Sequence, residues 1–212
     1  MIVSRRTIVW LVVLVVSVST LTPSAAFADH ERVLDETSDV TRTWWTGCGP
    51  TQDCAEHHET ARHRKVADIV WSQHKYTEKR LILRMKLRGT TVRRQVGTYV
   101  YWDIEGPRGT GLSTQILYSE GDPFTNLGSY DTDGYRCPAA RTTIRSRRGV
   151  FALTIPKNCL EGMPWVRVAA GVMVQDFRQG GGVWHDDARF GPGLEVRDGV
   201  AQRHFGPRLY IG

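Results

Sequence analysis

The chain has 212 residues, of which 41% are hydrophobic and 24% are charged, and its formal net charge at pH 7 is +6. This composition excludes a disordered tail, which holds fewer apolar residues, and a collagen-like rod, which needs glycine at every third position. The length is typical of a single domain with its own hydrophobic core.

The first 28 residues have the three parts of a secretory signal peptide. Arg5 and Arg6 form a positive start, an apolar stretch covers residues 8–21, and residues 26–28 read Ala-Phe-Ala, a small-x-small cleavage motif. We therefore expect cleavage after Ala28 and secretion; an uncleaved N-terminal anchor is the alternative. No later apolar run is long enough to cross a bilayer, so we expect no transmembrane segment after cleavage.

Residues 29–65 are expected to form an N-terminal arm. Residues 29–47 are polar, reach two adjacent tryptophans and lack helical periodicity, which favours an extended arm or an edge strand. Residues 48–65 hold a small cysteine loop and a charged, histidine-rich stretch. We interpret this stretch as a solvated linker.

Short segments of β type then predict a domain over residues 66–212. Residues 80–88 are the clearest, because apolar side chains alternate with mostly basic ones, so that one face packs and the other meets solvent. Residues 66–74 are the expected partner strand, across a turn at 75–78. Further strands are expected over 97–104, 112–119, 150–155, 165–174 and 208–211, with a long loop over 121–134.

Together these segments predict an all-β fold, an antiparallel β-sandwich, with a jelly roll or a barrel as alternatives. An even number of cysteines in an exported chain predicts disulfides, and we expect the pairs Cys48–Cys54 and Cys137–Cys159. The first would close a small loop, and the second would join two strands. The cysteine spacing fits neither zinc ligands nor a C-x-x-C redox pair.

Several short motifs of the domain resemble a group of small secreted actinobacterial proteins. These motifs are Ala67-Asp68-Ile69, His74, Cys137, residues 150–156, Cys159-Leu160, residues 164–168 and Asp186-Asp187-Ala188. The likeness spans about residues 66–212 and implies a β-sandwich-like fold and the pairing of Cys137 with Cys159. It implies no activity, so no catalytic residue is carried over.

The histidines before the domain superficially look like a metalloprotease motif. The motif H-E-x-x-H places two histidines four residues apart on one helical face. Here His58 and His63 are five apart, about 140° around a helix, and cannot share one metal from a regular helix. On a loop, His57, His58 and His63 could still collect zinc or copper. We prefer the interpretation as a charged linker without a metal.

Two acidic pairs stand out in the domain. Asp131 and Asp133 begin an Asp-Thr-Asp-Gly sequence like that of a calcium loop, but position twelve is Thr142, which excludes an EF-hand. A calcium site on a loop stays open, and the composition is equally typical of a turn. Asp186 and Asp187 could contribute to a site or cap the end of a strand. We expect no cofactor, and folding that needs no metal.

Arg141, Arg145 and Arg147 share one face of an expected strand. Their guanidinium groups would suit acidic glycans or phosphates, and a solvated strand face is the alternative. Because an exported protein rarely meets nucleic acid, the basic balance favours an anionic cell surface and no nucleic acid.

Trp44, Trp45 and Trp184 lie beside polar or glycine-rich stretches. If exposed, they could serve as stacking platforms for sugars. Core packing is the alternative, since a tryptophan buries a large area.

The expected function is that of a secreted, non-catalytic binding protein. Its partner would be a cell-wall or acidic glycan, or another extracellular molecule. The alternatives are a secreted hydrolase that uses carboxylates or a metal, and an inhibitor or partner-binding protein that acts through the N-terminal arm. The nucleophile motif G-x-S-x-G is absent, which argues only against hydrolases of that known pattern.

Overall fold

The computed structural model describes most of the chain after residue 29: residues 30–35, 38–46, 54–90, 96–119, 122–129, 137–160, 162–177, 182–189, 196–197, 200–201 and 204–211. In these ranges the regular structure is β-strand, apart from three 3-10 turns at Pro107–Gly109, Ser146–Arg148 and Lys157–Cys159. None of the helical turns there is long and apolar enough to cross a membrane. The prediction of an all-β fold is confirmed.

Five antiparallel strands form one sheet, here called the front sheet. In spatial order they are β1 (His30–Leu34), β4 (Ile69–Tyr76), β5 (Arg80–Leu87), β10 (Val150–Pro156) and β9 (Arg141–Arg145). The alternation over 80–88 predicted the β4–β5 hairpin. A tight turn joins β9 to β10, and its Gly149 has a φ of 60°, which glycine adopts without strain.

The second antiparallel sheet, here called the back sheet, contains the longest strands. In spatial order they are β3 (Ala55–Thr60), β2 (Thr41–Thr46), β12 (Val183–Asp187), β11 (Trp165–Asp176), β6 (Val96–Glu105), β7 (Gly111–Ser119) and β8 (Asp122–Ser129). The short β15 (Leu209–Tyr210) also pairs with β11, and β13 (Val196–Arg197) pairs with β14 (Val200–Ala201). The strand expected over 165–174 is therefore central, because it has strands on both sides.

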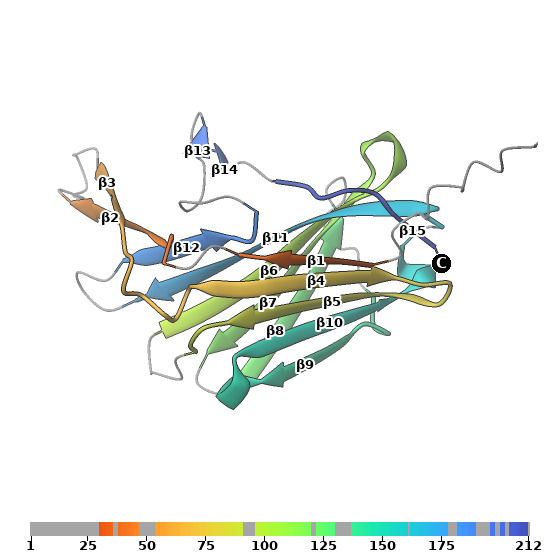
Figure 1. Ribbon diagram of the computed structural model, residues 1–212, viewed down its shortest axis with the longest axis horizontal. Coiled ribbons are helices and arrows are strands. Elements are labelled where there is room, and N and C mark those ends of the chain that lie inside the picture. Colours follow the sequence, from red (N-terminus) through yellow and green to blue (C-terminus); the bar gives the residue numbers. More distant parts are fainter. Residues whose placement is uncertain are drawn as a thin grey trace, which may run out of the picture.

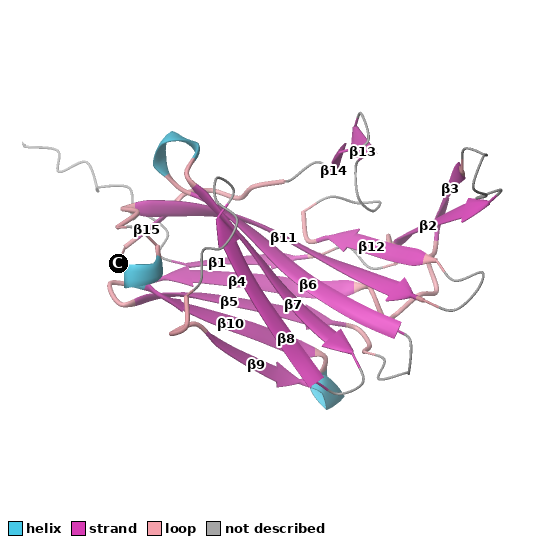
Figure 2. Ribbon diagram, turned by 180° about the vertical axis from the view of Figure 1, so that it is seen from behind, coloured by secondary structure: helices cyan, strands magenta, loops and turns pink. Residues whose placement is uncertain are grey.

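The two sheets lie one behind the other in a sandwich-like arrangement. Figure 1 shows β1, β4, β5, β10 and β9 crossing in front of β6, β7, β8 and β11, and Figure 2 shows the same layers from behind. The core lies between them: Trp102 of β6 and Phe151 of β10 are both fully buried and belong to one hydrophobic cluster. Burial of this inner surface is the main stabilising contribution to the fold.

The first segments after residue 29 supply strands to both sheets. β1 borders the front sheet, whereas β2 and β3 extend the back sheet. The histidine-rich stretch expected as a linker is strand β3. The loop expected over 121–134 is strand as far as Ser129. Its composition is typical of a turn, but β8 pairs only with β7, and an edge strand tolerates proline and glycine better than a central one does.

The expected disulfide between Cys137 and Cys159 is confirmed, with a Cα–Cα distance of 5.8 Å. It ties the chain before β9 to the 3-10 turn after β10, so it closes the open end of that hairpin. Cys48 lies outside the described residues, and with it the expected Cys48–Cys54 pair.

Replacing both Cys137 and Cys159 by alanine should lower the free energy of unfolding by roughly 3 kcal/mol, because a cross-link between residues 22 apart restricts the unfolded chain. Urea unfolding of this double variant, followed by tryptophan fluorescence, measures the loss. An unchanged midpoint would mean that the hairpin end is held by packing alone.

Candidate functional site

The outer side of the front sheet gathers basic side chains. Along each strand every second side chain faces the core, so Leu83 and Met85 are fully buried and Arg84 between them is exposed. The pairing register carries this alternation across all five strands. Seven basic residues result on the strands of this side, which we name the basic face: Arg32, Lys75, Arg80, Arg84, Lys86, Arg141 and Arg145. By the same register, the described strands place no acidic residue there.

A β-bulge in β4 adds an aromatic ring to the basic face. Ile69 pairs with Leu87 and Trp71 pairs with Lys86, so Val70 is an extra residue without a counterpart on β5. The extra residue lets Ile69 point into the core while Trp71, two residues later, faces outward. The guanidinium of Arg32, on the neighbouring β1, lies 5.3 Å from the ring centroid of Trp71.

The basic face is hollowed into a groove of about 450 Å³. Strand β10 forms its floor, because its outward side chains are short: Val150, Ala152 and Thr154. The longer side chains of β5 and β9 rise on either side as walls. They include Arg84 on one wall and Arg145 on the other.

The arginines of the basic face differ in how firmly they are held. Arg141 donates from Nη1 to the carbonyl oxygens of Pro138 and Ala140, at 2.8 and 2.9 Å, and so is fixed at the edge. Among the described residues, no ion pair involves Arg84 or Arg145. Their charges therefore face solvent uncompensated, which suits an anionic ligand.

Of the three arginines expected on one face, the register places Arg141 and Arg145 together and leaves Arg147 in the turn after β9. Sequence reasoning missed Arg80 and Arg84 as their neighbours across the groove. Alternation had placed Arg84 on a solvent-facing side of its strand. The local sequence does not show, however, that only β10 separates β5 from β9.

The three candidate tryptophans do not share one flat surface. Trp44 is half-buried, Trp45 is 46% exposed, and adjacent residues of a strand point to opposite sides. Trp184 is 7% exposed, with the guanidinium of Arg64 4.1 Å from its ring centroid. Arg42 lies between the rings of Trp44 and Trp184, at 4.9 and 5.7 Å from their centroids.

The candidate histidines do not converge on a common point. His57 Nε2 shares a hydrogen bond of 2.8 Å with the Thr46 hydroxyl. His58, on the other side of β3, shares one of 3.0 Å between its Nδ1 and the Thr43 hydroxyl. His63 lies in the turn after β3. In the described part of the chain, the only group of three potential ligands close enough for one ion is formed by aspartates. Asp131 and Asp133 lie outside the described residues.

A buried polar network has the appearance of a hydrolase triad. Ser72 Oγ lies 2.7 Å from His74 Nε2, and His74 Nδ1 lies 3.3 Å from Glu31 Oε2. Ser72 and His74, however, are both fully buried on the inner side of β4. A serine without exposed surface cannot reach a substrate, so this network is structural.

The second acidic pair is divided between two roles. Asp187 accepts a hydrogen bond from the backbone N–H of Arg189 at 2.9 Å, which caps the end of β12. Asp186 points instead toward the segment between β1 and β2.

No family model matches the chain, and no curated protein or solved structure matches it either.

Proposed function

We propose that this protein is a secreted, non-catalytic binding protein that holds an anionic extracellular polymer, such as an acidic cell-wall glycan, on the basic face. The observation that carries this proposal is the positive charge of the basic face. Its strands carry seven basic side chains and, among the described residues, no acidic one, around a groove of about 450 Å³.

The chemistry of the groove suits carboxylate, sulfate or phosphate groups on a polymer. Guanidinium groups bind such oxyanions with two parallel hydrogen bonds, and Arg84 and Arg145 present them from opposite walls. Neighbouring strands are about 4.8 Å apart, so walls two strands apart leave roughly 10 Å for a ligand chain. Trp71 supplies an apolar ring surface at the groove, against which a sugar ring can pack.

Binding is favoured over hydrolysis because, in the described triad-like arrangement of Ser72, His74 and Glu31, the serine is buried. Secretion after cleavage at Ala28 and a second disulfide between Cys48 and Cys54 belong to the same proposal. The resemblance to small secreted actinobacterial proteins agrees with export and assigns no activity.

We also propose that the sheets form a sandwich and not a closed barrel. The edge strands β8 and β9 approach through the hydroxyl groups of Thr125 and Thr142, 2.6 Å apart. No backbone ladder joins these two strands among the described residues. A side-chain contact between edges is typical of two sheets that remain separate.

The double variant Arg84→Glu/Arg145→Glu should weaken binding of polygalacturonate at least about tenfold, because it reverses the charge of both walls. Isothermal titration at low salt, repeated at increasing salt, measures the affinity. Binding by the unmodified protein should fall with salt, and neutral dextran should not bind.

The matched control is Arg62→Glu/Arg108→Glu, which changes the net charge equally at two exposed residues outside the basic face. It should retain most of the affinity. An equal loss in both double variants would show attraction by net charge alone. Absence of low-salt binding to polygalacturonate and to dextran sulfate would refute the proposal.

A further inference from the structure

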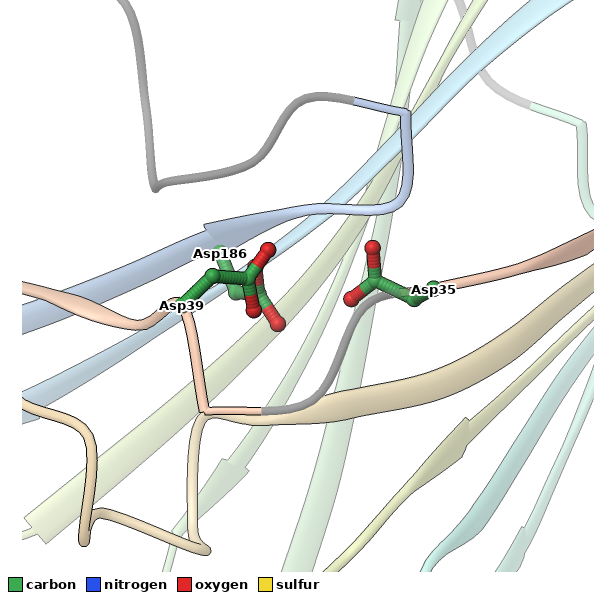
Figure 3. Close-up of side chains that lie close together, drawn as sticks. All are labelled: Asp35, Asp39 and Asp186. Atoms are coloured by element: carbon green, nitrogen blue, oxygen red, sulfur yellow. The ribbon is translucent and has the colours of Figure 1, made fainter.

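Three aspartates converge where the chain leaves the front sheet for the back sheet. Asp35 directly follows β1, Asp39 lies just before β2, and Asp186 belongs to β12. One carboxylate oxygen of each lies within 4.8 Å of those of the other two. Figure 3 shows the three side chains directed toward one another from these separate segments.

Two of the three aspartates are buried and Asp35 is half-buried, and one oxygen of Asp186 is left without a donor. Asp186 is fully buried and Asp39 is 5% exposed. Oδ2 of Asp186 accepts a hydrogen bond of 2.7 Å from the backbone N–H of Ile69, which fixes the side chain. Its Oδ1 is buried and receives no hydrogen bond from an N–H or hydroxyl of the described residues. Such an oxygen is costly unless another ligand reaches it.

Asp186 lies where its negative charge is disfavoured. Burial first, and then the neighbouring carboxylates Asp35 and Asp39, raise the pKa of Asp186 to about 10, whereas the hydrogen bond from the Ile69 N–H lowers it. Buried like charges at this separation are stable only when they are neutralised.

We propose that Asp35, Asp39 and Asp186 together bind a calcium ion. The three potential ligands are all carboxylate oxygens, which suit hard divalent cations better than zinc or copper. Calcium–oxygen distances of about 2.3–2.6 Å allow opposite ligands to lie up to about 5 Å apart, so ligand atoms that lie within 4.8 Å of one another can share one calcium ion. Magnesium, with distances of about 2.0–2.1 Å, needs a tighter and more strictly octahedral set of ligands.

The inference is independent of the proposed glycan binding. The ion would join the β1–β2 connection to β12, so it would hold together segments of both sheets. Sequence reasoning expected no metal and did not single out Asp35 or Asp39, which lie in a polar segment. Asp186 was noted only as half of an acidic pair.

The test is calcium titration of the purified protein after its metals have been removed with EDTA. Isothermal titration at pH 7.5 should give one saturable calcium site per chain, with magnesium bound at least about tenfold more weakly. Calcium should also raise the midpoint of thermal unfolding, because it binds the folded state.

Asp186→Asn should weaken calcium binding by more than about tenfold, since even indirect partners of a metal site cost that much. Asparagine keeps an oxygen for the Ile69 N–H. Asp39→Asn repeats the test should the first variant fail to fold, and Glu78→Gln, in the exposed turn after β4, is the matched control that should bind normally.

Two results would overturn the inference. One is a metal-free protein that shows neither saturable calcium binding nor a calcium-dependent unfolding midpoint, which would indicate a proton shared between Asp35 and Asp186. The other is calcium binding that is unchanged in both aspartate variants.

Discussion

Trp102→Ala should lower the free energy of unfolding by about 3–5 kcal/mol, the usual cost of removing a large buried aromatic ring. Trp102 is fully buried in the middle of β6. Its register partners are Thr114 on β7 and Ala170 on β11. Both are small, so the indole ring fills space that they leave and cannot refill. The loss therefore combines the transfer of the ring to water with an unfilled cavity.

The matched control is Trp45→Ala, which removes the same side chain where it is 46% exposed. That change should cost less than about 1 kcal/mol, as surface substitutions do. Urea unfolding of both variants with a common slope gives the comparison. Equal losses would mean that the core does not lie between β6 and the front sheet.

His74 should make the protein less stable in acid. It is fully buried between Ser72 and Glu31. Burial lowers the pKa of His74, and Arg189 adds to this, while Glu31 only partly opposes them. The unfolded chain therefore binds a proton below about pH 6.5 that the folded chain rejects. The free energy of unfolding should fall with pH there, by at most about 1.4 kcal/mol per pH unit.

His74→Gln removes the titrating imidazole while keeping a hydrogen-bonding side chain. At pH 7.5 the variant should be the less stable protein, because the imidazole packing is lost. The difference in the free energy of unfolding between the two proteins should then narrow as the pH falls from 6.5 to 5, since only the unmodified protein loses stability through the buried imidazole. Urea unfolding at each pH measures it, and His63→Gln shows the effect of replacing an exposed histidine. A difference that stays constant with pH would contradict the argument.

The local pattern was sufficient for the strands that have one clean buried face. Alternation over 80–88 predicted β5, because each buried leucine is separated by a solvent-facing residue. The apolar run over 165–174 predicted a central strand for a different reason, because side chains on both faces of that strand are largely buried. The pairing of Cys137 with Cys159 could be chosen because it closes one hairpin.

The sites could not be predicted because they depend on contacts between distant segments. Ile69 and Asp186 are 117 residues apart, yet they share a hydrogen bond. Arg84 and Arg145 meet across the groove only because β10 separates β5 from β9. The glycine-rich surroundings of Trp184 left exposure and core packing both open, and in the structure arginines cover its ring. Side chains from elsewhere in the chain decide such exposure.

The bulge at Val70 brings contacts on the two sides of strand β4 close together in the sequence. The N–H of Ile69 reaches into the interior toward Asp186, and the ring of Trp71 stands on the outer surface beside Lys86. Only Val70 separates them, and the ladder with β5 holds the strand beyond it. Residues 69–71, a segment of three residues, therefore contribute to the aspartate cluster on the inner side and to the basic face on the outer side.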